Sequence, residues 1–232
     1  MKVLFVFLMI AWSVALFGQN VFIPDENFKK YLLAKKNINT NRDSEIQVSE
    51  AIAFKGNIDC EGYEIKDLTG IEAFTALTEL FCSGNELSSL DVSKNTNLTY
   101  LECSNNQLTS LDVSNNTALI SLACDGNELK SLDVSKNTAL EVLDCDSNQL
   151  TSLDVSKNTA LEYLSCEGNQ LTSIDVSKNT ALTYLLCSKN KLTNLDVSKI
   201  TALKRLHCKG NPLKCVVGCR KKCKLKGATR CP

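Results

Sequence analysis

Histidine, tryptophan and proline are scarce in this sequence of 232 residues, which holds one His, one Trp and three Pro. A single imidazole, that of His207, excludes mechanisms that need two His side chains, such as His-rich zinc sites. Three Pro and ten Gly are too few for a collagen-like or proline-rich disordered chain. Basic and acidic residues balance at 26 each, so we expect no nucleic-acid binding by the chain as a whole. The remaining composition, 44% hydrophobic, suits one or two folded domains.

One long apolar run lies at the start of the chain. Lys2 is followed by residues 3–17, which are almost all apolar and about as long as the hydrophobic region of a secretory signal. A membrane-spanning helix needs about 20 apolar residues. The sequence therefore predicts a signal peptide over residues 1–18, with an uncleaved membrane anchor as the alternative. Since no second such run follows, we expect a secreted or cell-surface protein with no transmembrane segment after signal removal.

Cysteine recurs with a fixed period over most of the chain. Seven cysteines lie 21 residues apart and an eighth precedes them by 22 residues, and these are Cys60, Cys82, Cys103, Cys124, Cys145, Cys166, Cys187 and Cys208. The seven evenly spaced cysteines lie in or close to the pattern L-x-x-L-x-C-x-x-N-x-L-x-x-[LI]-D-V-S-x-N-T. The alternating x-L-x-C stretch predicts a strand. About ten residues remain for the return path, which is too few for a helix with two connections, so each repeat predicts one strand and one turn-like coil.

This pattern is typical of leucine-rich repeats in which Cys replaces one Leu. The Cys column with L-D-V-S-x-N-T resembles the internalin J-type leucine-rich repeats of bacterial surface proteins, and I-P-D-E-N-F-K-K-Y-L at residues 23–32 is similar to the start of secreted Bacteroidetes relatives. The resemblance covers residues 22–213 and implies an adhesive or protein-binding role. The expected fold is an α/β-type, mostly β, right-handed leucine-rich-repeat solenoid over residues 55–213, with a concave parallel sheet.

The eight repeat cysteines, called the cysteine ladder below, need a chemical assignment. An exported chain with 12 Cys suggests disulfides. Side chains at equivalent positions of parallel neighbours point the same way, however, which is poor disulfide geometry. Free Cys is also among the most buried residue types. We therefore expect buried, reduced thiols, with disulfide pairing and metal binding as alternatives.

A helical N-terminal cap is predicted over residues 19–54, with helices at residues 25–36 and 48–54. The loop between them follows the spacing of an EF-hand calcium loop. Its candidate ligands are Asn39, Asn41, Asp43, Glu45 and Glu50. Two departures weaken the match, because Asn39 replaces the first Asp and Ser44 replaces the turn Gly. The alternatives are a weak calcium site and a helix-loop-helix that only covers the apolar end of the first coil.

The end of the chain, residues 214–232, is basic and rich in cysteine. Residues 197–232 hold 11 Lys and Arg and no acidic residue, so all 26 acids lie in the rest of the chain. The disulfide candidates are Cys215, Cys219, Cys223 and Cys231. Two bridges would make a C-terminal cap, and a zinc site or a disordered tail are the alternatives. The basic residues form either a solvated face or a site for acidic polysaccharide, lipid headgroups or nucleic acid.

The concave face of the sheet is the candidate binding surface, because its residues vary while the return path hardly changes. The candidate partner-binding residues are Phe81, Tyr100, Asp144, Asp146, Tyr163, Glu167, Tyr184, Arg205 and His207. We expect a monomer that binds a protein there, and the alternative is carbohydrate binding on the tyrosines. Asp144 and Asp146 with Glu167 resemble a general acid–base set, but an open sheet offers no enclosed pocket. Since no catalytic motif is present, we expect no enzymatic activity and no cofactor besides calcium.

Overall fold

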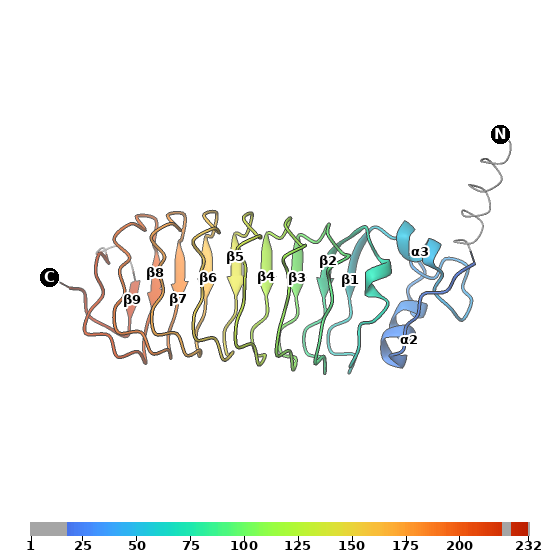
Figure 1. The fold of residues 1–232 in the computed structure, drawn as a ribbon, viewed down its shortest axis with the longest axis horizontal. Helices are drawn as coiled ribbons and strands as arrows, with labels where there is room; N and C mark the ends of the chain where they lie inside the picture. The colour runs from blue at the N-terminus through green and yellow to red at the C-terminus, as the bar shows by residue number, and fades with distance from the viewer. Residues whose placement is uncertain (1–17, 220–223, 232) are drawn as a thin grey trace, which may run out of the picture.

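The structure, a computed structural model, describes residues 18–219 and 224–231. The predicted signal peptide therefore lies outside the described residues, apart from Gly18. In the described part of the chain, no helix is long and apolar enough to cross a membrane. The described residues form an elongated solenoid with two short helices at one end (Figure 1).

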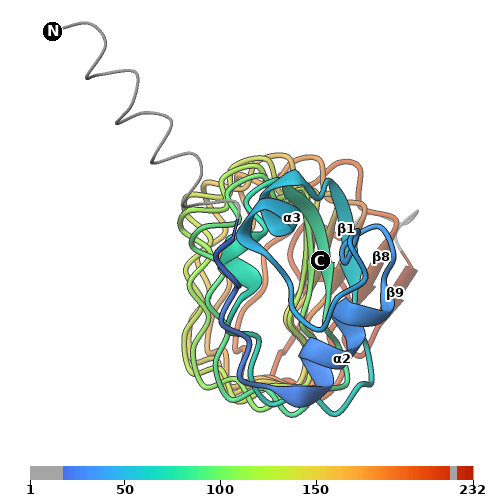
Figure 2. The same ribbon diagram turned by 90° about the vertical axis from the view of Figure 1, so that its right-hand side faces the viewer.

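One strand from each coil contributes to a single sheet, as the repeat predicted. Over the described residues the nine strands lie side by side in chain order, and every neighbouring pair is parallel. They are β1 (Gly56–Asp59), β2 (Leu77–Phe81), β3 (Tyr100–Glu102), β4 (Ser121–Ala123), β5 (Val142–Asp144), β6 (Tyr163–Ser165), β7 (Tyr184–Leu186), β8 (Arg205–His207) and β9 (Lys224–Lys226). The return paths are turns and extended segments, with one 3₁₀ turn, η1 (Ile71–Ala73). Viewed along the axis, the coils superimpose with the sheet on one side (Figure 2).

The core is a set of stacked columns inside the coils. In the β5 coil, Leu140, Leu143, Cys145 and Leu150 all have no exposed surface, and the same positions are buried in the neighbouring coils. Because each coil contacts mainly the coils before and after it, identical side chains stack on identical side chains. Each column therefore extends one continuous hydrophobic core along the solenoid.

All eight thiols of the cysteine ladder are free and buried. In the central coils, burial raises the pKa of these thiols well above the ordinary value of 9.0. The thiolate is the reactive form. Titration of the native protein with a thiol reagent should therefore label few groups, and denaturation without a reductant should expose about eight more. A denatured protein with no reactive thiol would contradict the assignment.

An Asn lies three residues after every ladder cysteine except Cys60, and it joins consecutive coils. Asn148 donates from Nδ2 to the carbonyl oxygens of Cys124 (3.0 Å), Cys145 (3.2 Å) and Asp146 (3.0 Å). Its Oδ1 accepts from the backbone N–H of Leu129 at 3.0 Å. These backbone groups cannot reach water, so the side chain satisfies hydrogen bonds that the chain turn leaves open.

A second column of Asn, from the D-V-S-x-N phrase, lies in the core. Asn137 has no exposed surface and donates to the carbonyl oxygens of Val113 and Asn116, both at 2.9 Å. The turn bond in this phrase is made by Asp, since Asp133 Oδ1 accepts from the N–H of Ser135 at 2.8 Å. The phrase thus combines a local turn, which its Asp makes, with links between neighbouring coils, which its Asn makes.

Two helices cover the N-terminal end of the solenoid: α2 (Glu26–Ala34) and α3 (Val48–Ala53). Asp25 caps α2 by accepting from the N–H of Phe28 at 2.9 Å, and its other oxygen accepts from the N–H of Lys66 at 2.8 Å. The same carboxylate thus caps the start of the helix and attaches it to the first coil. Phe28 and Leu32 are fully buried beneath the cap, which keeps the apolar end of the solenoid from water.

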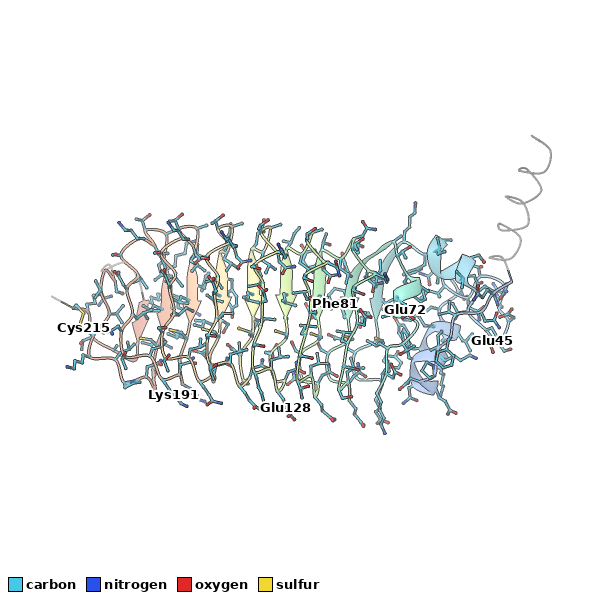
Figure 3. The ribbon with its side chains drawn as sticks, in the orientation of Figure 1. Glu45, Glu72, Phe81, Glu128, Lys191 and Cys215 are labelled. Atoms are coloured by element: carbon cyan, nitrogen blue, oxygen red, sulfur yellow. A yellow bond between two sulfur atoms is a disulfide. The ribbon has the colours of Figure 1, made fainter. Side chains whose placement is uncertain are left out.

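The basic end continues the solenoid. β9 pairs with β8 in the register of the earlier coils, so the sheet extends beyond residue 213, where the sequence analysis ended the repeats. A disulfide between Cys215 and Cys231 closes this last coil at the end opposite the helical cap (Figure 3). Cys219 is buried, and Cys223 lies outside the described residues. Gly227 takes the place of the ladder cysteine, and a Cβ there would lie 2.2 Å from Cα of Lys209.

Candidate functional site

The outward-facing side of the sheet, called the sheet face below, carries the candidate partner-binding residues in rows across the strands. Strand registers place one row through Glu79, Tyr100, Ser121, Val142, Tyr163, Tyr184, Arg205 and Lys224. The next row runs through Phe81, Glu102, Ala123, Asp144, Ser165, Leu186, His207 and Lys226. Consecutive members are about 4.8 Å apart, which is the spacing of paired strands.

Three candidates form a contiguous aromatic and cationic stripe. The rings of Tyr163 and Tyr184 have centroids 6.1 Å apart and planes tilted by 40°. The guanidinium carbon of Arg205 lies 5.7 Å from the centroid of Tyr184, a cation–π contact. The two tyrosines are half-buried and Arg205 is exposed, so part of each side chain is available to a partner.

Phe81 and Tyr100 lie on the same face but apart from this stripe. In the row of Tyr100, Ser121 and Val142 separate it from Tyr163. Tyr100 is 39% exposed. Phe81 ends β2 and is half-buried (Figure 3). The structure therefore brings Tyr163 and Tyr184 together, and it leaves Phe81 and Tyr100 outside the stripe.

The acidic candidates make a hydrogen-bonded group beside the stripe. One oxygen of Asp146 accepts from the hydroxyl of Ser165 at 2.6 Å and from the backbone N–H of Glu167 at 2.5 Å. Asp144 accepts from the N–H of Asp146 at 3.1 Å. Ser165 has no exposed surface, and the sequence analysis did not single it out.

Burial and crowding of like charges change the ionisation of this group. Burial raises the pKa of Asp146 to about 6. The neighbouring carboxylates of Asp144 and Glu167 also raise it, whereas the hydrogen bond from Ser165 lowers it. Burial also raises the pKa of Asp144 above its ordinary value. The acidic group therefore gains negative charge over the range from weakly acidic to neutral pH.

Asp146 should make the stability of the protein depend on pH. Because its pKa rises from 3.8 to about 6 on folding, its contribution is fully present below pH 3.8 and is lost as pH rises through about 6. The shift corresponds to at most about 3 kcal/mol, which solvent at this half-buried site reduces to about 1 kcal/mol. Urea unfolding at pH 4 and pH 7 should show that loss in the wild type and a smaller one in Asp146→Asn. Equal losses in the two proteins would contradict the assignment.

The EF-hand-like loop is closed by its own hydrogen bonds. Glu50 Oε1 accepts from the N–H of Thr40 at 2.8 Å and of Asn41 at 3.2 Å, and its Oε2 accepts from the N–H of Gln47 at 3.1 Å. Asn39 donates to the carbonyl oxygen of Asp43 at 2.9 Å. In the described part of the chain, no group of three or more His, Cys, Asp or Glu is placed to hold a metal ion.

Glu45, the remaining loop candidate, pairs with Lys29 of α2 at 2.7 Å. Glu50 has a structural role here as a cap of α3, and calcium binding stays a prediction. Burial opposes ionisation of Glu50, but hydrogen bonds from Thr40, Gln47 and Asn41 outweigh it and lower its pKa.

Replacing Glu50 by Gln separates the capping role from a calcium site. Gln keeps one acceptor but loses the charge, so we expect a lower melting temperature without calcium, by a few degrees for a loss of about 1 kcal/mol. If the loop binds calcium, the melting temperature of the wild type should rise with added calcium and that of Glu50→Gln should not. A calcium response that persists in the variant would place the site elsewhere, such as the acidic group on the sheet face.

Comparisons with known proteins agree with this architecture. Residues 138–179 match the family model of leucine-rich repeats in two copies. Internalin J of Listeria monocytogenes serotype 4b (strain F2365) is 46% identical over 78 residues. The repeats are similar to those of internalin J. The match covers 33% of this chain and only 8% of the length of internalin J.

Two solved internalin structures are similar to the solenoid. The functional domain of internalin J from Listeria monocytogenes, described as including a cysteine ladder, is 30% identical with a TM-score of 0.45, and the match covers 91% of this chain and 61% of that one. Internalin C2 from Listeria monocytogenes str. 4b F2365 is 21% identical with a TM-score of 0.79, over 92% of this chain and 98% of that one. At this identity the likeness to internalin C2 shows a shared fold alone.

Lys224 and Lys226 lie on the sheet face and were not among the candidate partner-binding residues. Lys224 and Lys226 extend the rows of Arg205 and His207 through the pairing of β9 with β8. The signal for them was the short stretch K-L-K-G, which repeats the in-and-out alternation of a strand without the ladder cysteine.

Proposed function

We propose that this chain is an exported, non-catalytic binding protein that engages a protein partner through the sheet face. The observation that carries the proposal is the contiguous stripe of Tyr163, Tyr184 and Arg205 on consecutive strands. Tyr and Arg are enriched among residues that dominate binding energy at protein interfaces. Repeat solenoids present extended surfaces of this kind to macromolecules.

The acidic group beside the stripe supplies charge selectivity for a basic partner. Asp144, Asp146 and Glu167 lie within two consecutive coils and are partly exposed. Complementary charge raises the rate of encounter more than it raises affinity, and dissolved salt screens it. Association with the partner should therefore slow as salt concentration rises.

Carbohydrate binding is the second candidate function. It is favoured by the spacing of the Tyr163 and Tyr184 rings, whose centroids lie 6.1 Å apart on one open surface. Aromatic faces of this kind support flat apolar ligand surfaces, including those of sugar rings. Catalysis is disfavoured because Asp144 and Asp146 lie on an open sheet with no enclosing lid among the described residues.

Export is part of the proposal and rests on the sequence. The apolar run at residues 3–17 has the length of a signal hydrophobic region. Export should place the protein outside the cytoplasm, either free or at the cell surface. Expression with the native start, followed by cell fractionation and mass spectrometry of the mature N-terminus, would test this part. Recovery of the protein only from the cytoplasm would contradict export, and a retained residue 1 in the exported protein would favour the uncleaved anchor.

The binding proposal is tested by a pull-down beside a glycan array. The bait is the purified protein, and the comparison bait carries Tyr163→Ala with Tyr184→Ala. A protein captured from host or envelope extract by the wild type and depleted with the variant supports the protein-binding proposal. Capture that is equal for both baits contradicts it, and selective binding to neutral glycans on the array would favour the carbohydrate alternative.

A further inference from the structure

The last coils of the solenoid contain a pocket whose lining includes three lysines. Its volume is about 430 Å³, and its lining residues are Glu167, Ser188, Lys189, His207, Lys209, Gly210 and Lys226. A volume of this size is at the lower end of the range for small-ligand pockets. It lies on the sheet face, at the opposite end from Phe81 and Tyr100.

Three lysines reach this pocket because three successive coils place them there. Lys189 and Lys209 occupy neighbouring coils, and the N–H of Lys189 donates to the carbonyl oxygen of Lys209 at 2.7 Å. The N–H of Cys208 donates to the carbonyl oxygen of Lys226 at 2.9 Å, which fixes the last coil against the previous one. With coils about 4.8 Å apart, the flexible side chains of these lysines are long enough to bring their ammonium groups to one small anion.

These positive charges have little compensation within the protein. Among the described residues, Lys189, Lys209 and Lys226 form no ion pair, and Glu167 is the one acidic residue in the pocket lining. Residues 197–232 contain no acid at all. Like charges held close together repel, and a bound anion would relieve that repulsion.

The backbone at Lys189 adds a separate observation. Lys189 has φ of 54°, in the left-handed region, and the equivalent positions of the adjacent coils are Gly168 at 66° and Gly210 at 78°. A residue with a Cβ in this conformation costs of the order of 1 kcal/mol relative to Gly. The chain thus carries a long cationic side chain at a position that Gly fills in both adjacent coils and that the shorter Ser147 and Asn105 fill two and four coils away.

We propose that this pocket binds a single anionic sugar residue, with its carboxylate or sulfate held by Lys189, Lys209 and Lys226. Lysine ammonium groups act as compact point charges and suit a small oxyanion approached from several sides. The ring of Tyr184 and the guanidinium of Arg205 lie on the adjoining row, where a neighbouring sugar of the same glycan would pack.

The surrounding charges favour a ligand with isolated anionic groups over a continuous polyanion. Beyond Glu167 the sheet face continues into Asp146 and Asp144 of the previous coil, so a nucleic acid or polyglutamate lying across the strands, along the solenoid axis, would meet repulsion. A glycan whose remaining residues are neutral avoids it. The pocket adjoins the proposed protein-binding stripe and shares none of its lining residues with it, so the pocket variant leaves the stripe unchanged and either proposal can fail without the other.

The test is a glycan array and a titration with matched charge variants. Lys189→Gly with Lys209→Gln removes two pocket charges, and the change at Lys189 also removes the cost of the left-handed backbone. Lys157→Gln with Lys178→Gln is the control, because it removes the same charge from exposed positions in the D-V-S-x-N loops. Melting temperatures of both variants establish that they are folded.

We expect the wild type to bind carboxylated or sulfated glycans and not their neutral parents. The pocket variant should lose at least about tenfold in affinity, and the control should stay within about twofold. Comparing carboxylated with sulfated versions of one glycan identifies the anion. Absence of binding to any anionic glycan, an equal loss in the control, or equally tight binding of polyglutamate or an oligonucleotide would each overturn the proposal.

Discussion

Asn148→Ala is expected to lower the free energy of unfolding by about 3 kcal/mol. The Asn148 side chain bonds to the carbonyl oxygens of Cys124 and Cys145 and to the N–H of Leu129, all in buried surroundings. Alanine would leave these groups without partners, and each unsatisfied buried group costs about 1–3 kcal/mol before the coils relax. Urea denaturation followed by circular dichroism measures the change.

The matched control is Thr151→Ala, three residues further along the same coil at an exposed position. It should change stability by no more than about 0.5 kcal/mol. Because repeat proteins are held together by contacts between neighbouring coils, Asn148→Ala should also weaken the coupling between the two halves of the solenoid. A lower slope of free energy against urea would report separate unfolding of the halves. A loss below about 1 kcal/mol would mean that the Asn column is not a main source of stability.

The Tyr163→Ala, Tyr184→Ala double variant is expected to lower affinity for the protein partner by at least about 30-fold, or about 2 kcal/mol. The two rings and Arg205 form one stripe, so removal of both rings deletes its central contact area. Both side chains are only half-buried, and stability should change less than binding. Surface plasmon resonance with the captured partner measures the affinity. Phe22→Ala is the control, since Phe22 is 74% exposed and lies in the N-terminal cap.

The basic end is the competing site for a macromolecular partner. Deleting everything after Leu213 is a poor test of it, because the deletion removes β9 and the Cys215–Cys231 disulfide and leaves β8 as a bare edge. Lys224→Ser with Lys226→Ser removes charge and keeps the coil. Normal binding by the tyrosine variant together with lost binding by this lysine variant would place the protein-binding function at the basic end.

Much of the fold followed from the repeat because its information is local. The 21-residue period determines the length of each coil, and the x-L-x-C alternation determines which side chains point inward. Neighbouring coils are nearly identical, so each position in one repeat lies beside the same position in the next. For that reason the repeat alone predicts that Tyr163, Tyr184 and Arg205 lie in one row.

Other features depend on contacts that no period encodes. The in-register pairing of β9 rests on the close approach of Gly227 to Lys209 and on the bridge between Cys215 and Cys231, which lie 16 residues apart in sequence. The environment of Asp146 depends on Ser165 of the next coil, which is buried although its row faces outward. The sequence by itself determined the repeat, the strand in each coil and the rows of the sheet face, since these arise from local alternation and stacking. Only the tertiary structure decided how the last coil closes, which carboxylate is buried and where the lysines meet, because burial and charge proximity depend on side chains from different coils.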